Sequence, residues 1–250
     1  RLFEAKEICY AVFKGGYVRE VVYSDPTLRP ASDIDILVAP EQRLATINAM
    51  KEAGFLLTVD PANVSHEANL CKDGICIDLH WDILRPGRTR VPTVGELLAH
   101  RCRHGDIWGL DDVGVVFLML VHPAFAKYIC SPNMDLNKVV DFALWVSRRS
   151  IDWDAVARLL QKTGLCAAAW SVLKWYGMLI EPGQLPVPDE FVRRIAPGLI
   201  RQRYLTRWLE SNLPTRWLEN PARIQFGLTL FLHDRPADAL HALRAIRRAR

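Results

Sequence analysis

Three aspartates in two apolar segments are the residues whose types and spacing could do chemistry in this sequence. Asp33 and Asp35 alternate with isoleucines over residues 32–36. In a strand, residues i and i+2 project from the same face about 6.5–7 Å apart, so these two carboxylates would converge. The isoleucines around them indicate a buried strand rather than a solvated edge. Burying two carboxylates on one face is costly unless a cation neutralises them.

A third aspartate, Asp78, is flanked by Ile77 and Leu79, as expected of one inward carboxylate on a neighbouring strand. Three acids from two strands can hold one or two divalent ions about 3.5–4 Å apart, the arrangement used for in-line phosphoryl displacement. Mg²⁺ typically takes one or two carboxylates together with substrate phosphates. The sequence therefore predicts a site for Mg²⁺ or Mn²⁺ formed by the three aspartates.

A pair of glycines, Gly15 and Gly16, follows Lys14 upstream of these acids. Glycines allow backbone N–H groups to approach phosphate oxygens closely. Paired glycines mark ordinary turns more often than phosphate sites, so the indication comes from their combination with the acids downstream. Lys14 would either cover the end of a helix or take part in this phosphate site.

Two histidines accompany the acids. His80 shares one face of its strand with Asp78. It could orient a carboxylate, contact substrate or be a hydrogen-bonded core histidine. The same roles are open to His66.

The elements that must position these residues change in kind along the chain. Helical and strand patterns alternate in the first part, with helices expected at 2–13 and 41–54 and strands at 33–38, 66–71 and 75–81. From about residue 95 the pattern is almost wholly helical, with helices expected at 111–128, 136–148, 154–160, 167–179, 189–195, 201–209, 216–232 and from 234 to the end. We therefore expect an α+β fold, with a small mixed-sheet core at 1–95 followed by an all-helical domain at 96–250.

Taken together, these motifs resemble a known family. Lys14-Gly15-Gly16, the segment 32–38 and Asp78-Leu79-His80-Trp81 are similar to motifs of a family of largely uncharacterised bacterial nucleotidyltransferases, in the superfamily with the DNA polymerase β-like fold. The resemblance covers most of residues 8–180. It implies an enzyme that binds a nucleoside triphosphate with Mg²⁺, transfers a nucleoside monophosphate to an acceptor hydroxyl and releases pyrophosphate.

The resemblance also implies roles for individual residues. Asp33 and Asp35 would hold the metals, and Asp78 would bind the second metal and draw the proton from the attacking hydroxyl. The residues expected at the nucleotide are Lys14, Gly15, Gly16, Arg29 and Ser32. The superfamily usually has Ser where Gly16 stands, so a hydroxyl contact to phosphate at that position is in doubt.

The acceptor is left open as a small molecule, a peptide or an RNA. A toxin-like enzyme that nucleotidylates tRNA is one alternative, because residues 193–250 contain 12 arginines against four acidic residues. Those arginines could equally solvate the outer faces of helices. A non-catalytic nucleotide-binding protein is the other alternative, although the intact set of three acids argues against it.

The composition of the chain excludes several other classes of protein. Half of the 250 residues are hydrophobic and the net charge is only +4, which excludes a disordered or low-complexity chain. No apolar run approaches the roughly 18 residues that would span a bilayer, so no membrane association is expected. The six cysteines are scattered without a CxxC pair, which favours a reducing cytoplasm. Cys71 and Cys76 could face each other across a hairpin, but we expect free thiols.

Overall fold

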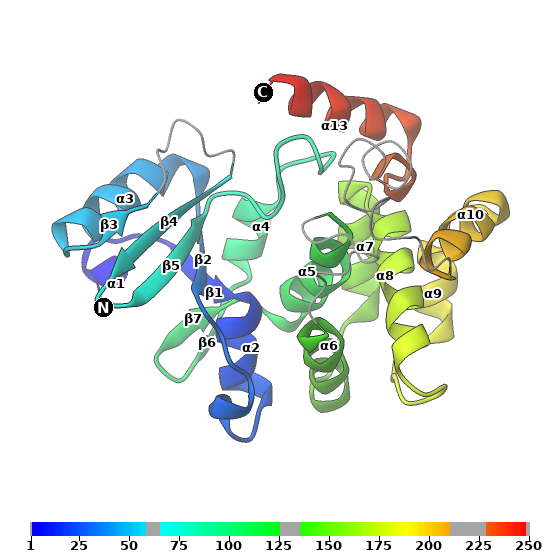
Figure 1. Ribbon diagram of the computed structural model, residues 1–250, viewed down its shortest axis with the longest axis horizontal. Coiled ribbons are helices and arrows are strands. Elements are labelled where there is room, and N and C mark those ends of the chain that lie inside the picture. The colour runs from blue at the N-terminus through cyan, green and yellow to red at the C-terminus, as the bar shows by residue number, and fades with distance from the viewer. Residues whose placement is uncertain (1, 59–65, 126–135, 211–228, 249–250) are drawn as a thin grey trace. The chain divides into compact units, whose positions relative to one another are not determined.

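The computed structural model describes residues 2–58, 66–125, 136–210 and 229–248, and all structural statements below refer to these residues. The chain forms two compact units (Figure 1). The first, here called the sheet unit, contains Arg1–Pro86 and Pro92–Val115. The second, the helical unit, contains Gly87–Val91 and Val116–Arg250. Together they give the α+β fold that the sequence predicts.

The sheet unit is built on a mixed sheet of seven strands in the order β3-β4-β5-β2-β1-β7-β6 (Figure 1). The central strand β2 runs antiparallel to β1 and parallel to β5, which forms an antiparallel hairpin with β4. The strands are β1 (Tyr10–Phe13), β2 (Ile34–Val38), β3 (Leu56–Leu57), β4 (Glu67–Lys72), β5 (Ile75–His80), β6 (Cys102–His104) and β7 (Ile107–Gly109).

The helices of the sheet unit are α1 (Leu2–Ala5), α2 (Lys14–Val22), α3 (Arg43–Glu52) and α4 (Val94–Ala99). The expected helix over 2–13 is therefore wrong beyond its first turn. Glu7 has a φ of 52°, which interrupts the helix, and the aromatic and β-branched residues from Tyr10 onward form the strand β1 instead. Because β1 pairs with β2 along its whole length, the sheet decides this segment and overrides its helical spacing.

One face of the sheet carries the apolar core. Ile36, Leu70 and Leu79 from three neighbouring strands pack with Ile47 and Met50 of α3 in one cluster of buried residues. Since side chains alternate between the two faces of a strand, the residues between these apolar positions point to the opposite face. That opposite face receives the aspartates.

Two short strands, which the sequence did not predict, lie just before the first helix expected after residue 95. β7 pairs in parallel with β1, with Gly109 next to Val12, and β6 completes the edge. A side chain at Gly109 would have no room, because a Cβ there would lie 2.1 Å from the ring of Tyr17. This packing accounts for a glycine at the point where β7 meets α2.

The β4–β5 hairpin corrects the expectation for two cysteines. Cys71 and Cys76 form a disulfide rather than free thiols. The reason is the two-residue turn of Asp73 and Gly74, which sets the two cysteines directly opposite each other with their Cα atoms 4.2 Å apart. The location of the protein in the cell, which was inferred from cysteine usage, stays a prediction.

In the helical unit, described helices coincide with the expected ones to within a few residues. They are α5 (Asp112–Phe125, whose first residues belong to the sheet unit), α6 (Asn137–Arg148), α7 (Trp153–Thr163), α8 (Cys166–Leu179), α9 (Asp189–Ile195), α10 (Leu199–Glu210) and α13 (Pro236–Arg248). The expected helix over 216–232 falls mostly outside the described residues, and its last residues, Thr229–Leu232, form a short 3₁₀ helix. None of the helices in the described parts of the chain is long and apolar enough to cross a membrane.

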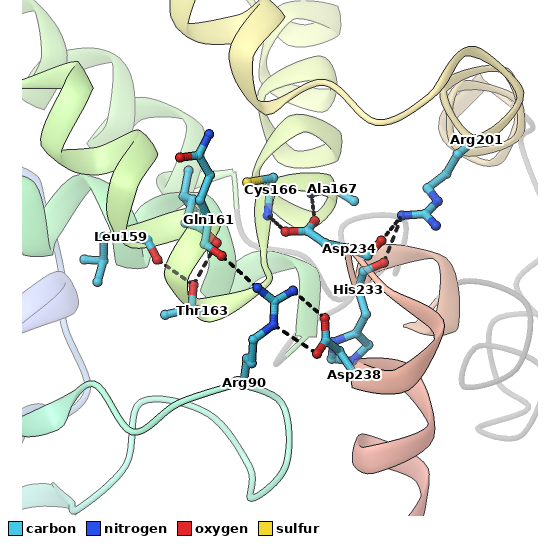
Figure 2. A network of polar contacts seen from close by, with 11 residues as sticks. Arg90, Leu159, Gln161, Thr163, Cys166, Ala167, Arg201, His233, Asp234 and Asp238 are labelled. Atoms are coloured by element: carbon cyan, nitrogen blue, oxygen red, sulfur yellow. Dashed lines mark hydrogen bonds and ion pairs between the residues drawn. The ribbon is translucent and has the colours of Figure 1, made fainter.

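Polar contacts join distant segments of the helical unit (Figure 2). The guanidinium of Arg90 donates to both carboxylate oxygens of Asp238 in α13, at 3.1 and 2.7 Å, and to the carbonyl of Gln161 at 3.0 Å. Asp234 accepts from the backbone N–H groups of Cys166 and Ala167 at the start of α8. The bonds of Arg90 tie the short segment 87–91 to α7 and α13 of the helical unit.

Candidate active site

The three strands β2, β5 and β4 bring polar side chains into one row. Asp35 of β2 is the cross-strand partner of Asp78 in β5, and Asp78 is the partner of Asn69 in β4. Cross-strand partners lie on the same face about 4.5–5.5 Å apart. The row lies on the face opposite the core that α3 covers, as the alternation of Asp35 with Ile36 requires.

Asp35 is the most buried of the three aspartates, with 6% of its surface exposed. Its Oδ1 accepts from the Lys14 ammonium at 2.7 Å and lies 2.9 Å from Nε2 of His80. Burial alone would raise the pKa of Asp35, but the hydrogen bond with His80 and the positive charge of Lys14 outweigh it and lower that pKa. Asp35 is therefore a carboxylate already neutralised by a cation of the chain itself.

Asp33 has the opposite electrostatic environment. It lies half-buried just before β2, and burial together with the negative charges of Asp35 and Asp78 raises its pKa. Asp78 accepts a hydrogen bond from the amide of Asn69 at 2.6 Å. The three carboxylates are thus close enough to repel one another, and only Asp35 is paired with a lysine.

Lys14 stands at the junction of β1 and α2 in a left-handed conformation, with a φ of 56°. Few non-glycine residues adopt it, and it costs on the order of 1 kcal/mol. Its ammonium lies between Asp35 and His80, 3.2 Å from Nε2 of the histidine. Of the two alternatives for Lys14, this geometry favours a part in the site over a cover for the helix end.

Gly15 and Gly16 occupy the first turn of α2, whose leading N–H groups have no acceptor within the helix. The Arg29 guanidinium, on a residue 7% exposed, packs against Gly15 so closely that a Cβ there would lie 2.8 Å from Nη2. Gly16 lies beside the start of β2, where a Cβ would be 3.7 Å from the Asp33 carbonyl. A helix N-terminus and an arginine therefore adjoin the row of acids, and both are suited to anions.

The remaining expected residues lie further out. Ser32 is exposed, and its hydroxyl donates to Asp33 at 3.3 Å. His66 precedes β4, with its ring centre 6.0 Å from that of His80. Burial, with the nearby charges of His80 and Lys14, lowers the pKa of His66 to about 3, so this ring is neutral at pH 7.

Comparison with protein families fits this arrangement. The model of a family described as uncharacterised nucleotidyltransferase matches residues 1–179. The chain belongs to this nucleotidyltransferase family. None of the curated proteins matches the sequence. Among solved structures, the solution structure of the antibiotic-resistance factor ANT(2'')-Ia aligns with 9% identity and a TM-score of 0.44, over 64% of this chain and 86% of that one. That likeness is too low to indicate a substrate.

For a nucleotidyltransferase, the donor set at the row suits a divalent metal. Asp35, Asp78 and His80 each offer a ligand atom, and these atoms all lie within 4.8 Å of one another. Burial raises the pKa of Asp33, and so does repulsion by Asp35 and Asp78; a cation placed among the three carboxylates would relieve this repulsion. Carboxylate oxygens are the ligands that Mg²⁺ prefers.

Two residues of the site were not singled out from the sequence. Asn69 orients Asp78, and Glu67 faces His80 in the register of the hairpin. Both could have been found by counting back from the Asp73-Gly74 turn, because a two-residue turn fixes which residues of β4 and β5 lie opposite each other.

Proposed function

We propose that this protein is a nucleotidyltransferase that uses Mg²⁺ or Mn²⁺ to move a nucleoside monophosphate from a nucleoside triphosphate to an acceptor hydroxyl. The observation that carries the proposal is the pairing of Asp35 with Asp78 in register on adjacent parallel strands, with Asp33 two residues earlier. Family membership over residues 1–179 supports the reaction class.

In this proposal, Asp33, Asp35 and Asp78 hold the divalent metal. When bound, the metal supplies positive charge that polarises the phosphate and lowers the pKa of an acceptor hydroxyl. When no metal is bound, Lys14 neutralises Asp35, as the 2.7 Å ion pair supports. When a metal neutralises Asp35, the Lys14 ammonium would be free to bind the phosphates.

Asp78 is the proposed general base. The amide of Asn69 engages its Oδ1, so Oδ2 is the oxygen that would receive the proton of the acceptor hydroxyl. The acceptor oxygen forms a bond to the α-phosphorus, and the bond from that phosphorus to the bridging oxygen of pyrophosphate breaks. The nucleotide would lie with its phosphates at the N-terminus of α2, near Gly15 and Arg29.

For the acceptor, only a class is proposed: a hydroxyl group of a small molecule, a peptide or an RNA. Two of the arginines that made RNA plausible have internal partners. Arg194 pairs with Asp154, and Arg201 donates to the carbonyls of His233 and Asp234. Residues 211–228 and 249–250, with their arginines, lie outside the described residues.

The test is incubation of the purified protein with each of the four α-labelled ribonucleoside triphosphates and Mg²⁺ or Mn²⁺, with and without total RNA and cell extract. Label should appear in an RNA, protein or small-molecule fraction, with release of pyrophosphate. Asp78→Asn should abolish the transfer and retain nucleotide binding.

The matched control is Asp73→Asn, an exposed carboxylate in the turn of the same hairpin whose φ of 49° asparagine tolerates. It should transfer label at the wild-type rate. Nucleotide binding by a folded protein without pyrophosphate release under any of these conditions would favour the non-catalytic alternative. Transfer by Asp78→Asn at the wild-type rate would remove Asp78 as the base.

A further inference from the structure

A second cluster of metal-ligating side chains lies beside the acidic row, at the end of the same hairpin. It consists of His66, Glu67 and His80, each offering one ligand atom, and these atoms all lie within 4.8 Å of one another. We propose that this cluster, here called the histidine site, binds Zn²⁺ separately from the divalent metal held by the aspartates.

The hairpin register creates the histidine site. Glu67 of β4 is the cross-strand partner of His80 in β5, so the two side chains share one face. Glu67 Oε2 lies 3.2 Å from Nδ1 of His80 and 3.5 Å from Nε2 of His66. One oxygen of this carboxylate is therefore near a nitrogen of each imidazole.

The contacts of His80 leave Nδ1 as the ring nitrogen that faces this site. Its Nε2 lies 2.9 Å from Asp35 Oδ1, and because a carboxylate only accepts, the hydrogen belongs on Nε2. The Lys14 ammonium, 3.2 Å from the same nitrogen, already donates to Asp35. Nδ1 is therefore the nitrogen of His80 that a metal at the histidine site would coordinate.

That Nδ1 atom is an exception among buried polar groups. His80 is 2% exposed, and its Nδ1 is buried without an aligned hydrogen bond, although it faces Glu67. A metal ion bound by Nδ1 and Glu67 would give this buried nitrogen a partner and would release any proton that it carries.

The donor set selects the metal. Two imidazole nitrogens and one carboxylate oxygen are a ligand set that Zn²⁺ uses with one position left open, whereas Mg²⁺ prefers oxygen ligands. Zinc at Nδ1 would also fix the ring that contacts Asp35 through Nε2, because the second nitrogen of a metal-bound histidine commonly donates to a carboxylate. The histidine site would thereby hold one residue of the acidic row in place.

The experiment measures binding directly rather than activity. The tag-free protein, with its free cysteines alkylated, is titrated with Zn²⁺ against a chromophoric chelator in excess Mg²⁺, and with Co²⁺ as a spectroscopic probe. The test variants are His66→Gln and Glu67→Gln. The controls are His104→Gln, an exposed histidine of β6, and Asp33→Asn in the acidic row.

One equivalent of Zn²⁺ should bind the wild type and both controls. His66→Gln and Glu67→Gln should bind at least roughly 100-fold more weakly, because losing even an outer partner of a ligand typically costs 10- to 100-fold. Thermal unfolding of the metal-free variants checks that each remains folded. Wild-type affinity in His66→Gln would overturn the proposal, and so would loss of binding in Asp33→Asn, which would place the metal among the aspartates.

Discussion

Replacing Asp33 and Asp35 by asparagine, one at a time, should move the stability of the metal-free protein in opposite directions. Both variants should lose nucleotidyl transfer, because both carboxylates are proposed metal ligands. Their effects on folding differ because Asp35 is paired within the chain, whereas Asp33 is repelled by Asp35 and Asp78.

For Asp35→Asn, the free energy of unfolding at pH 7 should fall by about 2 kcal/mol, the typical worth of hydrogen bonds to a charged group. The side chains of Asp35 and Lys14 are only 9% and 19% exposed, so the lysine is left largely desolvated without its partner. The lowered pKa of Asp35 means that its contribution is present above the ordinary pKa of 3.8 and is lost as the pH falls. Wild type and variant should therefore converge in stability in acid.

For Asp33→Asn, stability at pH 7 should rise by about 0.5 kcal/mol, a value kept small because the residue is partly exposed and solvent screens it. Its raised pKa means that the folded state binds the proton more tightly than the unfolded state. Ionisation of Asp33 therefore costs stability as the pH rises above 3.8, and asparagine removes this cost.

The assay is urea unfolding at pH 7 in EDTA, repeated in Mg²⁺. Mg²⁺ should stabilise the wild type, because a ligand that binds only the folded state shifts the equilibrium by mass action. It should stabilise both variants less. If Asp35→Asn unfolds at the same or a higher urea concentration than wild type in EDTA, the assignment of Lys14 and His80 as its neutralising partners is refuted.

Three further substitutions test the packing around the site and the helical unit. Gly15→Ala should raise the KM for the nucleotide, because the new methyl would lie 2.8 Å from Arg29 Nη2 and displace the guanidinium. Gly109→Ala should lower the free energy of unfolding by about 2 kcal/mol, because its Cβ would overlap the ring of Tyr17. His233→Leu should flatten the pH dependence of stability between pH 6.5 and 4. Burial lowers the pKa of His233 to about 4, so the unfolded state binds the proton first and the wild type loses about 3 kcal/mol over that range as the pH falls.

Control substitutions of the same type at other positions separate these site-specific effects from the effect of the substitution itself. Gly95→Ala adds a methyl to α4 where nothing lies within 4 Å, so it should leave KM unchanged and should not lower the free energy of unfolding. His100→Leu, at an exposed histidine, is the control for the histidine-to-leucine substitution itself. An unaltered KM in Gly15→Ala would show that Arg29 does not serve the nucleotide. An unaltered profile in His233→Leu would show that this histidine titrates normally.

The elements that carry the aspartates could be predicted because their signals are local. The alternation of Asp33 and Asp35 with isoleucines defines a strand face, and the Asp73-Gly74 turn defines a hairpin. The amphipathic helices of the second half depend on spacing alone, so their expected positions agree with the described ones. Strand β1 was missed because its four residues have no alternation of their own and form a strand only by pairing with β2.

What the sequence by itself determined is the set of acids, their common face and the α+β class, because these follow from periods of two and 3.6 residues along the chain. Only the tertiary structure decided which charges meet. Lys14 and His80 are 21 and 45 residues from Asp35 in the chain, yet both contact its carboxylate. The same holds for Arg90 and Asp238, 148 residues apart. Pairing at such separations depends on the order of the strands and the packing of the helices. The resulting neighbours determine whether a buried carboxylate is repelled by another acid or neutralised by a cation.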